Sequence, residues 1–438
     1  MVKVVKFGGS SVATGEAFDK VKKIVTSDKA RTAVVVSAPG KRFSGDTKVT
    51  DLLYVLHAHV KYNAPYDEVL LKIKERYEEI KAHCNLKIDL DAEFALISAK
   101  LSKKTSVDYI VSRGEYLSAK LMAEYLGYEF IDSATCLYFD YNGKVKFEET
   151  YEAIAREIAT KKKVVISGFY GSDPSGEIKT FSRGGSDITG SIVAAAIGAE
   201  SYENWTDVSG IMSADPRIVD NPTPIANVTF AELRELSYMG AEVLHEDAVF
   251  PVRDKNIPLY IKNTNDIDAR GTLVMESFDE TEKDKKEHFV TGVSGKKDFA
   301  VLTFVKNGMT EDVGFINKVL SAFGSFSVSV EMVSSSIDTF SVTVAQSEIR
   351  DCLHELMTKI DETASPNSVK IENDVSLIAV VGRRLAYNVG IAGRIFTSLG
   401  ENGINIKMLE QGSDELSIII GVSNADYKKA IKVLYGLI

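Results

Sequence analysis

The first two-thirds of the sequence alternate short β-branched runs with longer amphipathic stretches, and this alternation limits the possible folds more than any other feature. Residues 2–7, 32–37 and 163–167 are clear short runs, and helical patterns occupy about 16–26 and 187–198. Runs that are apolar at nearly every position are typical of parallel strands covered by helices on both faces. The sequence therefore predicts an α/β fold with a buried, mostly parallel sheet.

A helical insertion is predicted after the second of these strands. Residues 48–62, 65–83 and 89–101 each carry apolar side chains at helical spacing, with charged faces between them. An insertion of this kind can cover a functional site.

The C-terminal third contains an internal repeat. Residues 313–324 align without a gap with residues 389–400, an offset of 389 − 313 = 76 residues, and the same offset pairs Met332 with Met408. Each copy reads as a strand, a glycine-marked helix, a strand, a turn and a strand, which predicts a small sheet with helices on one face. The alternative, a match through shared propensity alone, is disfavoured by the identical register of apolar and glycine positions.

A charge run lies between these two regions. Residues 279–288 have no apolar period, and we interpret them as an exposed connector, although a solvated helix face would give the same pattern. We therefore expect a first domain over 1–278, a connector over 279–297, and repeats over 298–373 and 374–438. In an alternative arrangement, residues 424–438 complete the sheet of the first repeat.

Composition excludes several classes of protein. With 438 residues, 45% of them apolar, and a mean hydropathy of -0.04, the chain is expected to form an ordinary soluble protein with several domains. The 52 Lys and Arg residues are outnumbered by 62 Asp and Glu residues, so no basic field exists to hold nucleic acid. No apolar run approaches the roughly 18 residues of a membrane helix, and the opening run is too short for a secretory signal. We expect a cytoplasmic protein that binds neither nucleic acid nor a membrane.

The cysteines argue against a disulfide framework and against a zinc site. Cys84, Cys136 and Cys352 are scattered and lack CxxC or CxxH spacing. We interpret them as small buried hydrophobic residues, and we expect no dedicated metal site in the chain.

The first motif with chemical potential is Lys6-Phe-Gly-Gly-Ser-Ser11, at the end of the first strand. Two glycines let successive backbone N–H groups converge on an anion, and Lys6 adds a positive charge beside them. This arrangement suits a phosphate group, although a Lys-x-Gly-Gly segment is more often an ordinary turn. The sequence lacks both the P-loop pattern GxxxxGKS/T and the dinucleotide pattern GxGxxG, which disfavours those two classes of site.

The second motif is Thr180-Phe-Ser-Arg-Gly-Gly-Ser-Asp187, in a glycine-rich loop before a helix of small apolar residues. Arg183 can bind a carboxylate through two hydrogen bonds, and Asp187 can accept from an ammonium group. The glycine pair and the helix start add N–H donors. These features fit an α-amino acid ligand; the alternative is an Asp or Ser N-cap with an arginine nearby.

The third motif is the segment from Trp205 to Arg217, in which a strand runs into a polar turn with Asp-Pro-Arg. Such a loop can supply contacts to adenine and ribose, with Arg217 placed for phosphate. The alternative for each of these residues by itself is an Asp-Pro turn with a surface salt bridge.

Together and in this order, five motifs resemble the aspartate kinases of the amino acid kinase family. They are KFGGSS at 6–11, SRGE at 112–115, SRGGSD at 182–187, WTDVSGIMSADPR at 205–217 and GAEVLH at 240–245. The C-terminal repeats look like paired ACT domains, so the resemblance covers nearly the whole chain. It implies a three-layer α/β sandwich, similar to carbamate kinase, with a mostly parallel central sheet, followed by two ferredoxin-like ACT domains of βαββαβ topology.

The resemblance also implies an activity. Aspartate kinases transfer the γ-phosphoryl group of ATP, supplied with Mg²⁺, to the β-carboxylate of L-aspartate, giving 4-phospho-L-aspartate and ADP at the head of lysine, threonine and methionine synthesis. Phosphoryl transfer needs in-line positioning and cancellation of charge, which a lysine, backbone amides and Mg²⁺ provide. The β-carboxylate is already ionised near neutral pH, so no catalytic base is required.

The resemblance assigns the site residue by residue. Lys6 and Asp187 are expected to be catalytic, Arg183 to clamp the α-carboxylate and Glu115 to face the ammonium group. The expected substrate-binding residues are Thr50, Glu115, Arg183, Gly184, Gly185 and Ser186. The expected ATP-binding residues are Lys6, Phe7, Gly8, Gly9, Thr206, Asp207, Met212 and Arg217.

The first repeat aligns with the effector site of lysine-sensitive members. The residues expected to surround the effector are Met309, Asp312, Phe315, Ile316, Ser329, Val330, Glu331 and Ser336. An acid at Glu331 can pair with the side-chain ammonium of lysine, whereas the alternative is an ordinary solvated strand residue. The second repeat has Lys407 at the equivalent position, so we expect it to build a homodimer interface rather than a lysine site. Pairing of such dimers would give a tetramer.

Two departures from the family pattern leave alternatives open. Glu242 stands where many members carry a lysine near the nucleotide, and Met212 stands where some carry a tyrosine. Lys262 could substitute for the missing cation; otherwise nucleotide affinity is lowered. The alternatives to an aspartate kinase are a kinase of another carboxylate, such as glutamate, and an ACT-type amino-acid sensor with an impaired catalytic site.

Overall fold

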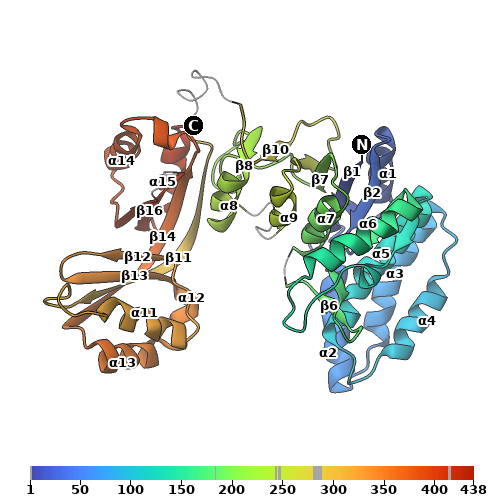
Figure 1. The fold of residues 1–438 in the computed structure, drawn as a ribbon, viewed down its shortest axis with the longest axis horizontal. Coiled ribbons are helices and arrows are strands. Elements are labelled where there is room, and N and C mark those ends of the chain that lie inside the picture. Colours follow the sequence, from blue (N-terminus) through green and yellow to red (C-terminus); the bar gives the residue numbers. More distant parts are fainter. Residues whose placement is uncertain (1, 183, 242–243, 245–247, 280–288, 413–415) are drawn as a thin grey trace. The chain divides into compact units, whose positions relative to one another are not determined.

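The computed structural model describes residues 2–182, 184–241, 244, 248–279, 289–412 and 416–438 (Figure 1). The chain forms two compact units. The first comprises Met1–Ile211, Pro224–Ser237 and Glu242–Asp279, and the second comprises Met212–Thr223, Tyr238–Ala241 and Glu280–Ile438. Two short segments from the first two-thirds of the sequence therefore belong to the second unit.

The first unit is built on an eight-stranded sheet in the order β3-β4-β2-β1-β7-β9-β10-β8. Neighbouring strands are parallel except for β9 and β10, which are antiparallel. The strands are β1 Lys3–Phe7, β2 Arg31–Val36, β3 Glu129–Ile131, β4 Val164–Ser167, β7 Ser201–Thr206, β8 Asn227–Thr229, β9 Leu259–Asn263 and β10 Thr272–Met275. The predicted mostly parallel sheet is confirmed.

Helices cover both faces of this sheet. They are α1 Gly15–Ser27, α2 Val49–Tyr62, α3 Asp67–Cys84, α4 Leu90–Lys100, α5 Val107–Leu126, α6 Phe147–Lys161, α7 Gly185–Ala196, α8 Phe230–Tyr238 and α9 Phe250–Asp254; β5 Tyr170–Ser172 and β6 Ile178–Thr180 form a separate hairpin. The predicted helical insertion is confirmed as α2, α3 and α4.

The apolar runs explain the layers. Val5, Phe7, Val34 and Val36 join one buried core with side chains of α1 to α5. Helix α7 packs against β1, β2 and β7, and α6 and α9 pack against α7. Each fully buried valine or phenylalanine contributes roughly 1.5–3 kcal/mol relative to an exposed one, which holds the central strands between two helical layers.

The second unit is built on a six-stranded antiparallel sheet in the order β12-β13-β11-β14-β16-β15. Its strands are β11 Gly292–Val305, β12 Met332–Ser335, β13 Thr339–Ala345, β14 Ser368–Val381, β15 Met408–Gln411 and β16 Ser417–Ser423. Its helices are α11 Phe315–Ser325, α12 Gln346–Ile349, α13 Leu353–Ala364, α14 Ile391–Glu401 and α15 Tyr427–Tyr435.

The repeat is visible in this unit. Helices α11 and α14 begin and end 76 residues apart, as do β12 and β15. Each copy has its own core, one around Phe315 and Phe323 and the other around Ile391 and Ile395. The two long strands β11 and β14 run through both halves and join them into one sheet.

The ends of the two halves differ from the sequence expectation. Residues 292–296 were expected in the connector, but they form the start of β11 and pair with the end of β14. Helix α15 packs with α14 in the second core through Ala430, Ile431 and Leu434. It does not complete the sheet of the first repeat, contrary to the alternative arrangement. The pairing of β11 with β14 is irregular between Lys296 and Phe299, where Asp298 has a positive φ of 68°. The charge run at 280–288 lies outside the described residues.

None of the helices in the described ranges is both long and apolar enough to cross a membrane. Of the three cysteines, all free, Cys136 is buried as expected, whereas Cys84 and Cys352 are half-buried.

Candidate active site

A cavity of about 590 Å³ lies in the first unit, where β1, β2 and β7 end. The loops that follow adjacent parallel strands meet at one edge of a sheet, which is where ligands bind in open α/β folds. The lining residues are Lys6, Gly8, Gly9, Ser10, Ser37, Ala38, Pro39, Gly40, Lys41, Lys48, Thr50, Glu115, Phe169, Gly184, Gly185, Ser186, Asp187, Thr206 and Asp207.

The glycine turn after β1 forms one wall. The Gly8 N–H donates to the Trp205 carbonyl on β7 at 3.1 Å, and the Ser11 N–H donates back to the Gly8 carbonyl at 3.0 Å. A Cβ atom on Gly9 would lie 3.0 Å from the Ala38 carbonyl oxygen, so the turn packs closely against the loop after β2. This close approach favours glycine at the position, because a side chain would have to displace the neighbouring loop.

Lys6, which is buried, and Asp187, which is half-buried, form an ion pair in the cavity. Lys6 comes from β1 and Asp187 from the first turn of α7, so two elements far apart in the sequence supply the pair. Asn204 on β7 donates through Nδ2 to Asp187 Oδ1 at 2.9 Å. The pair and its amide partner hold the Lys6 ammonium group beside the glycine turn, where it can stabilise an anion.

Glu115 is buried on α5, and among the described residues only one of its two carboxyl oxygens has a hydrogen-bond partner. Its Oε1 accepts a hydrogen bond from the Ala38 N–H at 3.0 Å, whereas Oε2 has no partner among the described residues. Burial raises the pKa of Glu115 to about 8, although the Ala38 hydrogen bond opposes this shift. The group is therefore mostly protonated at neutral pH, and an ammonium group that approaches Oε2 would favour its ionised form.

The structure gathers most of the predicted site residues in this cavity. Those that line it are Lys6, Gly8, Gly9, Thr50, Glu115, Gly184, Gly185, Ser186, Asp187, Thr206 and Asp207. The Phe7 side chain, just before the glycine turn, is fully buried and stacks with the Trp205 ring, so it does not line the cavity itself. Arg183 and Glu242 lie outside the described residues. Met212 and Arg217 belong to the second unit.

Sequence reasoning missed several lining residues. The loop after β2 contributes Ser37, Ala38, Pro39, Gly40 and Lys41, and the end of the predicted strand at residue 37 was the available signal because parallel strands end at the same edge. Phe169 also lines the cavity, with a backbone φ of 80°. This conformation is rare for phenylalanine, so the sequence did not predict it. The Nζ atom of Lys262, which was considered as a replacement cation, lies 5.1 Å from the centre of the Trp205 ring.

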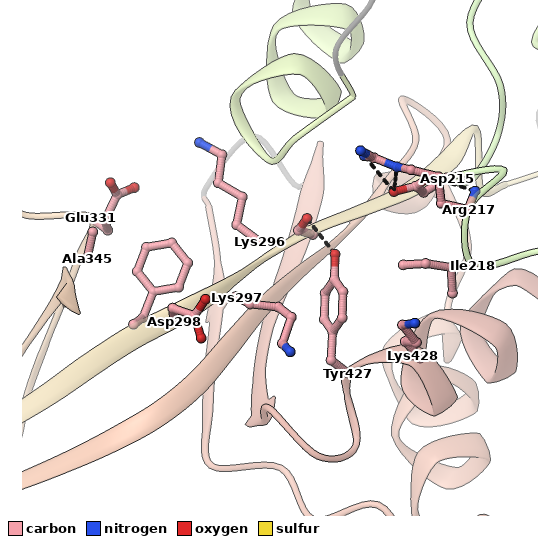
Figure 2. A pocket seen from close by; sticks show the side chains of 12 residues that line it. Asp215, Arg217, Ile218, Lys296, Lys297, Asp298, Glu331, Ala345, Tyr427 and Lys428 are labelled. Carbon is pink, nitrogen blue, oxygen red and sulfur yellow. Dashed lines mark hydrogen bonds and ion pairs between the residues drawn. The ribbon is translucent and has the colours of Figure 1, made fainter. Parts of the chain in front are cut away.

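The second unit contains a groove of about 510 Å³ that holds two other predicted residues, Arg217 and Glu331 (Figure 2). Arg217 pairs with Asp215 at 2.9 Å, and Glu331 Oε2 accepts a hydrogen bond from the Tyr238 hydroxyl at 2.5 Å. Figure 2 shows Lys296 and Lys297 pointing to opposite sides of β11, so the basic side chains do not converge on one point.

The other predicted effector residues lie apart from this groove. Met309 and Phe315 are buried in the first core, and Val330 packs against that core. Asp312 pairs with Lys306 and Lys318, and the Ser329 N–H donates to Glu348 at 2.6 Å. Ile316 and Ser336 are exposed. Lys407 forms an ion pair with Glu372 in the second unit.

The fold and the cavity define a class of protein. A glycine turn, a buried lysine and a helix start meet at the edge of a mostly parallel sheet, and a unit with two related halves follows, as in a phosphotransferase with a regulatory region. Residues 1–263 match the amino acid kinase family, and residues 378–436 match the ACT domain family. The chain belongs to the aspartokinases of the amino acid kinase family, and it is therefore a phosphotransferase.

Relatives match the chain along almost its whole length. Aspartokinase 3 of Bacillus subtilis is 37% identical over 449 residues, covering 99% of this chain and 98% of the relative. Aspartate kinase of Clostridium acetobutylicum is 43% identical, with a TM-score of 0.90 and 99% of each chain covered. Escherichia coli aspartokinase III in complex with aspartate and ADP is 25% identical, with a TM-score of 0.80, covering 100% of this chain and 99% of that one.

The raised pKa of Glu115 predicts that the free energy of unfolding depends on pH. The folded state holds a proton between the unfolded pKa near 4.5 and the folded pKa of about 8, so stability falls as pH rises through this window by roughly 1.4 kcal/mol per pH unit. Glu115→Gln should remove this slope, as measured by denaturant unfolding from pH 5 to pH 8. Glu129→Gln, at an exposed position on β3, should keep the wild-type slope. Equal slopes for wild type and Glu115→Gln would contradict the prediction.

Proposed function

We propose that the cavity binds MgATP and L-aspartate together and transfers the γ-phosphoryl group to the β-carboxylate. A β-carboxylate oxygen forms a bond to the γ-phosphorus, the bond from that phosphorus to the β,γ-bridging oxygen breaks, and ADP leaves with the bonding electron pair. The observation that carries this proposal is the convergence in one cavity of a lysine and glycine turn suited to phosphate with a buried carboxyl group suited to an ammonium ion. The complex of E. coli aspartokinase III with aspartate and ADP supports the same pair of ligands.

Charge cancellation would fall to Lys6 and the glycine turn. The Lys6 ammonium group lies 3.6 Å from a Cβ position built on Gly8, so lysine and turn can share one phosphoryl group. Asp187 and Asn204 hold the lysine in place. Such preorganised donors stabilise the charge that spreads over the equatorial oxygens during transfer.

The nucleotide would bring its own magnesium ion. No group of three His, Cys, Asp or Glu side chains that could hold a metal occurs within the described parts of the chain. Mg²⁺ commonly uses one or two carboxylates, waters and substrate phosphates instead of a cage of protein ligands. Asp207, which lines the cavity beside Thr206, would be a candidate carboxylate for this ion.

The amino acid would be gripped at its two ends. Glu115 lines the cavity and its unpartnered Oε2 would accept from the ammonium group, while the start of α7 offers backbone N–H donors around Gly185 and Ser186. Thr50 lies at the start of α2 on the wall of the same cavity. Arg183 would complete the clamp on the α-carboxylate. We place this activity in the cytoplasm, where ATP and aspartate are available.

We further propose that the second unit binds lysine and forms a homodimer. The structure of E. coli aspartokinase III with lysine and aspartate supports lysine as the effector. The edge strands β12 and β15 expose Val333 and Leu409 at equivalent positions of the repeat, and Val313 and Val389 are almost fully exposed. Exposed apolar residues on open sheet edges favour association with a second copy.

Substrate specificity provides the direct test. ADP release in the presence of MgATP should depend on L-aspartate, and L-glutamate should give a kcat/KM at least about tenfold lower because its extra methylene moves the carboxylate away from the phosphoryl group. A coupled assay with each amino acid measures both values. Faster turnover with glutamate would support a kinase of that amino acid, and turnover with neither would support an amino-acid sensor.

The lysine at the glycine turn should be essential. Lys6→Met should lower kcat by at least about 100-fold, because it removes a preorganised cation from the transferring group. Lys3→Met is the matched control on the same strand, since Lys3 pairs with Asp28 and does not line the cavity. A Lys6→Met enzyme with kcat within threefold of wild type would exclude the proposed role.

Lysine inhibition should depend on Glu331. Loss of a charge-assisted pair in Glu331→Gln should raise the half-inhibitory lysine concentration by at least about tenfold. Tyr238→Phe should lower the half-inhibitory lysine concentration, because the Tyr238 hydroxyl competes with lysine for the same oxygen of Glu331. Inhibition curves measured at fixed aspartate test both variants. Wild-type turnover that lysine does not affect, or equal curves for wild type and Glu331→Gln, would reject this effector assignment.

A further inference from the structure

Arg76 is a buried cation in the helical insertion, and its contacts lead to the cavity. The residue lies on α3 and is 3% exposed. Its Nη2 donates to the Gly40 carbonyl at 2.6 Å, and its Nη1 donates to the Thr47 carbonyl at 3.0 Å. Nη1 also lies 3.1 Å from Asp46 Oδ2. Every hydrogen bond and ion pair that Arg76 makes with described residues therefore goes to the loop between β2 and α2.

This loop, residues 37–48, is closed by its own contacts. The Arg42 N–H and Nε both donate to Asp46 Oδ2 at 2.9 Å, and the Asp46 N–H donates to the Phe43 carbonyl at 3.0 Å. The Val49 N–H donates to the Pro39 carbonyl at 3.0 Å, which ties the two ends of the loop together. Arg76 contacts both sides of this closed loop, at Gly40 and at Thr47.

Gly40 joins the loop to the glycine turn. Its N–H donates to the Gly9 carbonyl at 2.8 Å, while its own carbonyl accepts from Arg76. A Cβ atom on Gly40 would lie 2.7 Å from the Gly9 carbonyl carbon and 2.8 Å from the Ser10 nitrogen. Gly9 and Gly40 both line the cavity. The two hydrogen bonds of Gly40 thus form a continuous path from the guanidinium group to the phosphate-binding turn.

Simple packing does not account for an arginine at this position. Burial of a guanidinium group is costly, and a well-packed apolar side chain of similar volume commonly gives equal or better stability. The planar fork, however, can bind two carbonyl groups at once, which a lysine ammonium on a flexible stem does with less definition. The geometry therefore uses the donors of Arg76 and not only its bulk.

We propose that Arg76 is a positioning residue that holds the Gly8–Gly9 turn in register for phosphoryl transfer through Gly40. Its catalytic consequence rests on the proposed function, since the turn must contact the transferring group. A misplacement of about 1 Å at a reacting centre can cost on the order of 100-fold in rate. The insertion would thereby support the catalytic turn from behind.

The test compares variants on both sides of Gly40. Arg76→Met keeps the stem but removes the donors, Arg76→Lys keeps the charge, and Gly40→Ala pushes on the turn directly. Each should lower kcat by about 10- to 100-fold, with KM values changed less than about threefold. Glu79→Gln is the control about one turn further along α3, because within the described part of the chain the hydrogen bond of Glu79 goes to Arg42 and not to Arg76 or Gly40. It should keep wild-type kcat.

Two further measurements separate positioning from general destabilisation. Hydrogen exchange should accelerate over residues 7–12 and 37–50 in Arg76→Met. Over residues 7–12 it should remain unchanged in Glu79→Gln, whose contact with Arg42 lies in the loop and not in the glycine turn. Low, non-denaturing concentrations of guanidinium chloride should partly restore kcat to Arg76→Ala, whereas a merely destabilised enzyme would lose activity further.

A folded Arg76→Met enzyme with kcat within twofold of wild type, or with unchanged exchange over residues 7–12, would overturn the proposal. If that variant does not fold, wild-type kcat in both Arg76→Lys and Gly40→Ala would overturn it equally. If wild type shows no aspartate-dependent turnover, the proposed function fails, and the exchange comparison still decides the role of Arg76.

Discussion

The parallel pairing of β1 with β2 and β7 is the constraint on which the site depends. Phe7 pairs in register with Val36 on one side and with Trp205 on the other, so the three strands end together. The glycine turn, the loop after β2 and Thr206 then meet at one edge, although they are distant in the sequence. Full burial of Val5 and Val34 between helical layers holds these strands in the sheet.

The charges in the cavity are arranged to tolerate burial. Lys6 is paired with Asp187, and Asn204 satisfies the same carboxylate, so neither charge is isolated. Glu115 avoids the cost of burying a charge in another way, since burial keeps its carboxyl group protonated until a cation approaches. The ammonium group of an amino acid would supply the opposite charge that Glu115 lacks, and the phosphates of a nucleotide would add a second anion beside Lys6.

The second unit contains segments of the first domain's sequence. After Asp207 the chain enters Met212–Thr223, and at the end of α8 it enters Tyr238–Ala241. Both segments belong to the unit with the six-stranded sheet. The Tyr238 hydroxyl binds Glu331, the residue proposed to recognise an effector. If the second unit binds an effector as proposed, the covalent continuity between cavity residues and these segments would offer a physical route for coupling. A conformational change of the second unit would then act on the chain that leads into the cavity.

The sequence by itself determined the layers, the insertion and the repeat. Apolar periodicity is a local property, and it located the strands β1, β2 and β4, the helices α2 to α4, and the equivalent helices α11 and α14. The motifs also identified Lys6, Glu115 and Asp187 as members of one site. Only the tertiary structure decided that Gly40 and Phe169 line the cavity, that Arg76 reaches it from α3, that Arg217 belongs to the second unit, and that β11 runs through both halves. These features arise from contacts between distant segments and from backbone conformations such as the positive φ of Phe169, and no local pattern of residue types encodes either.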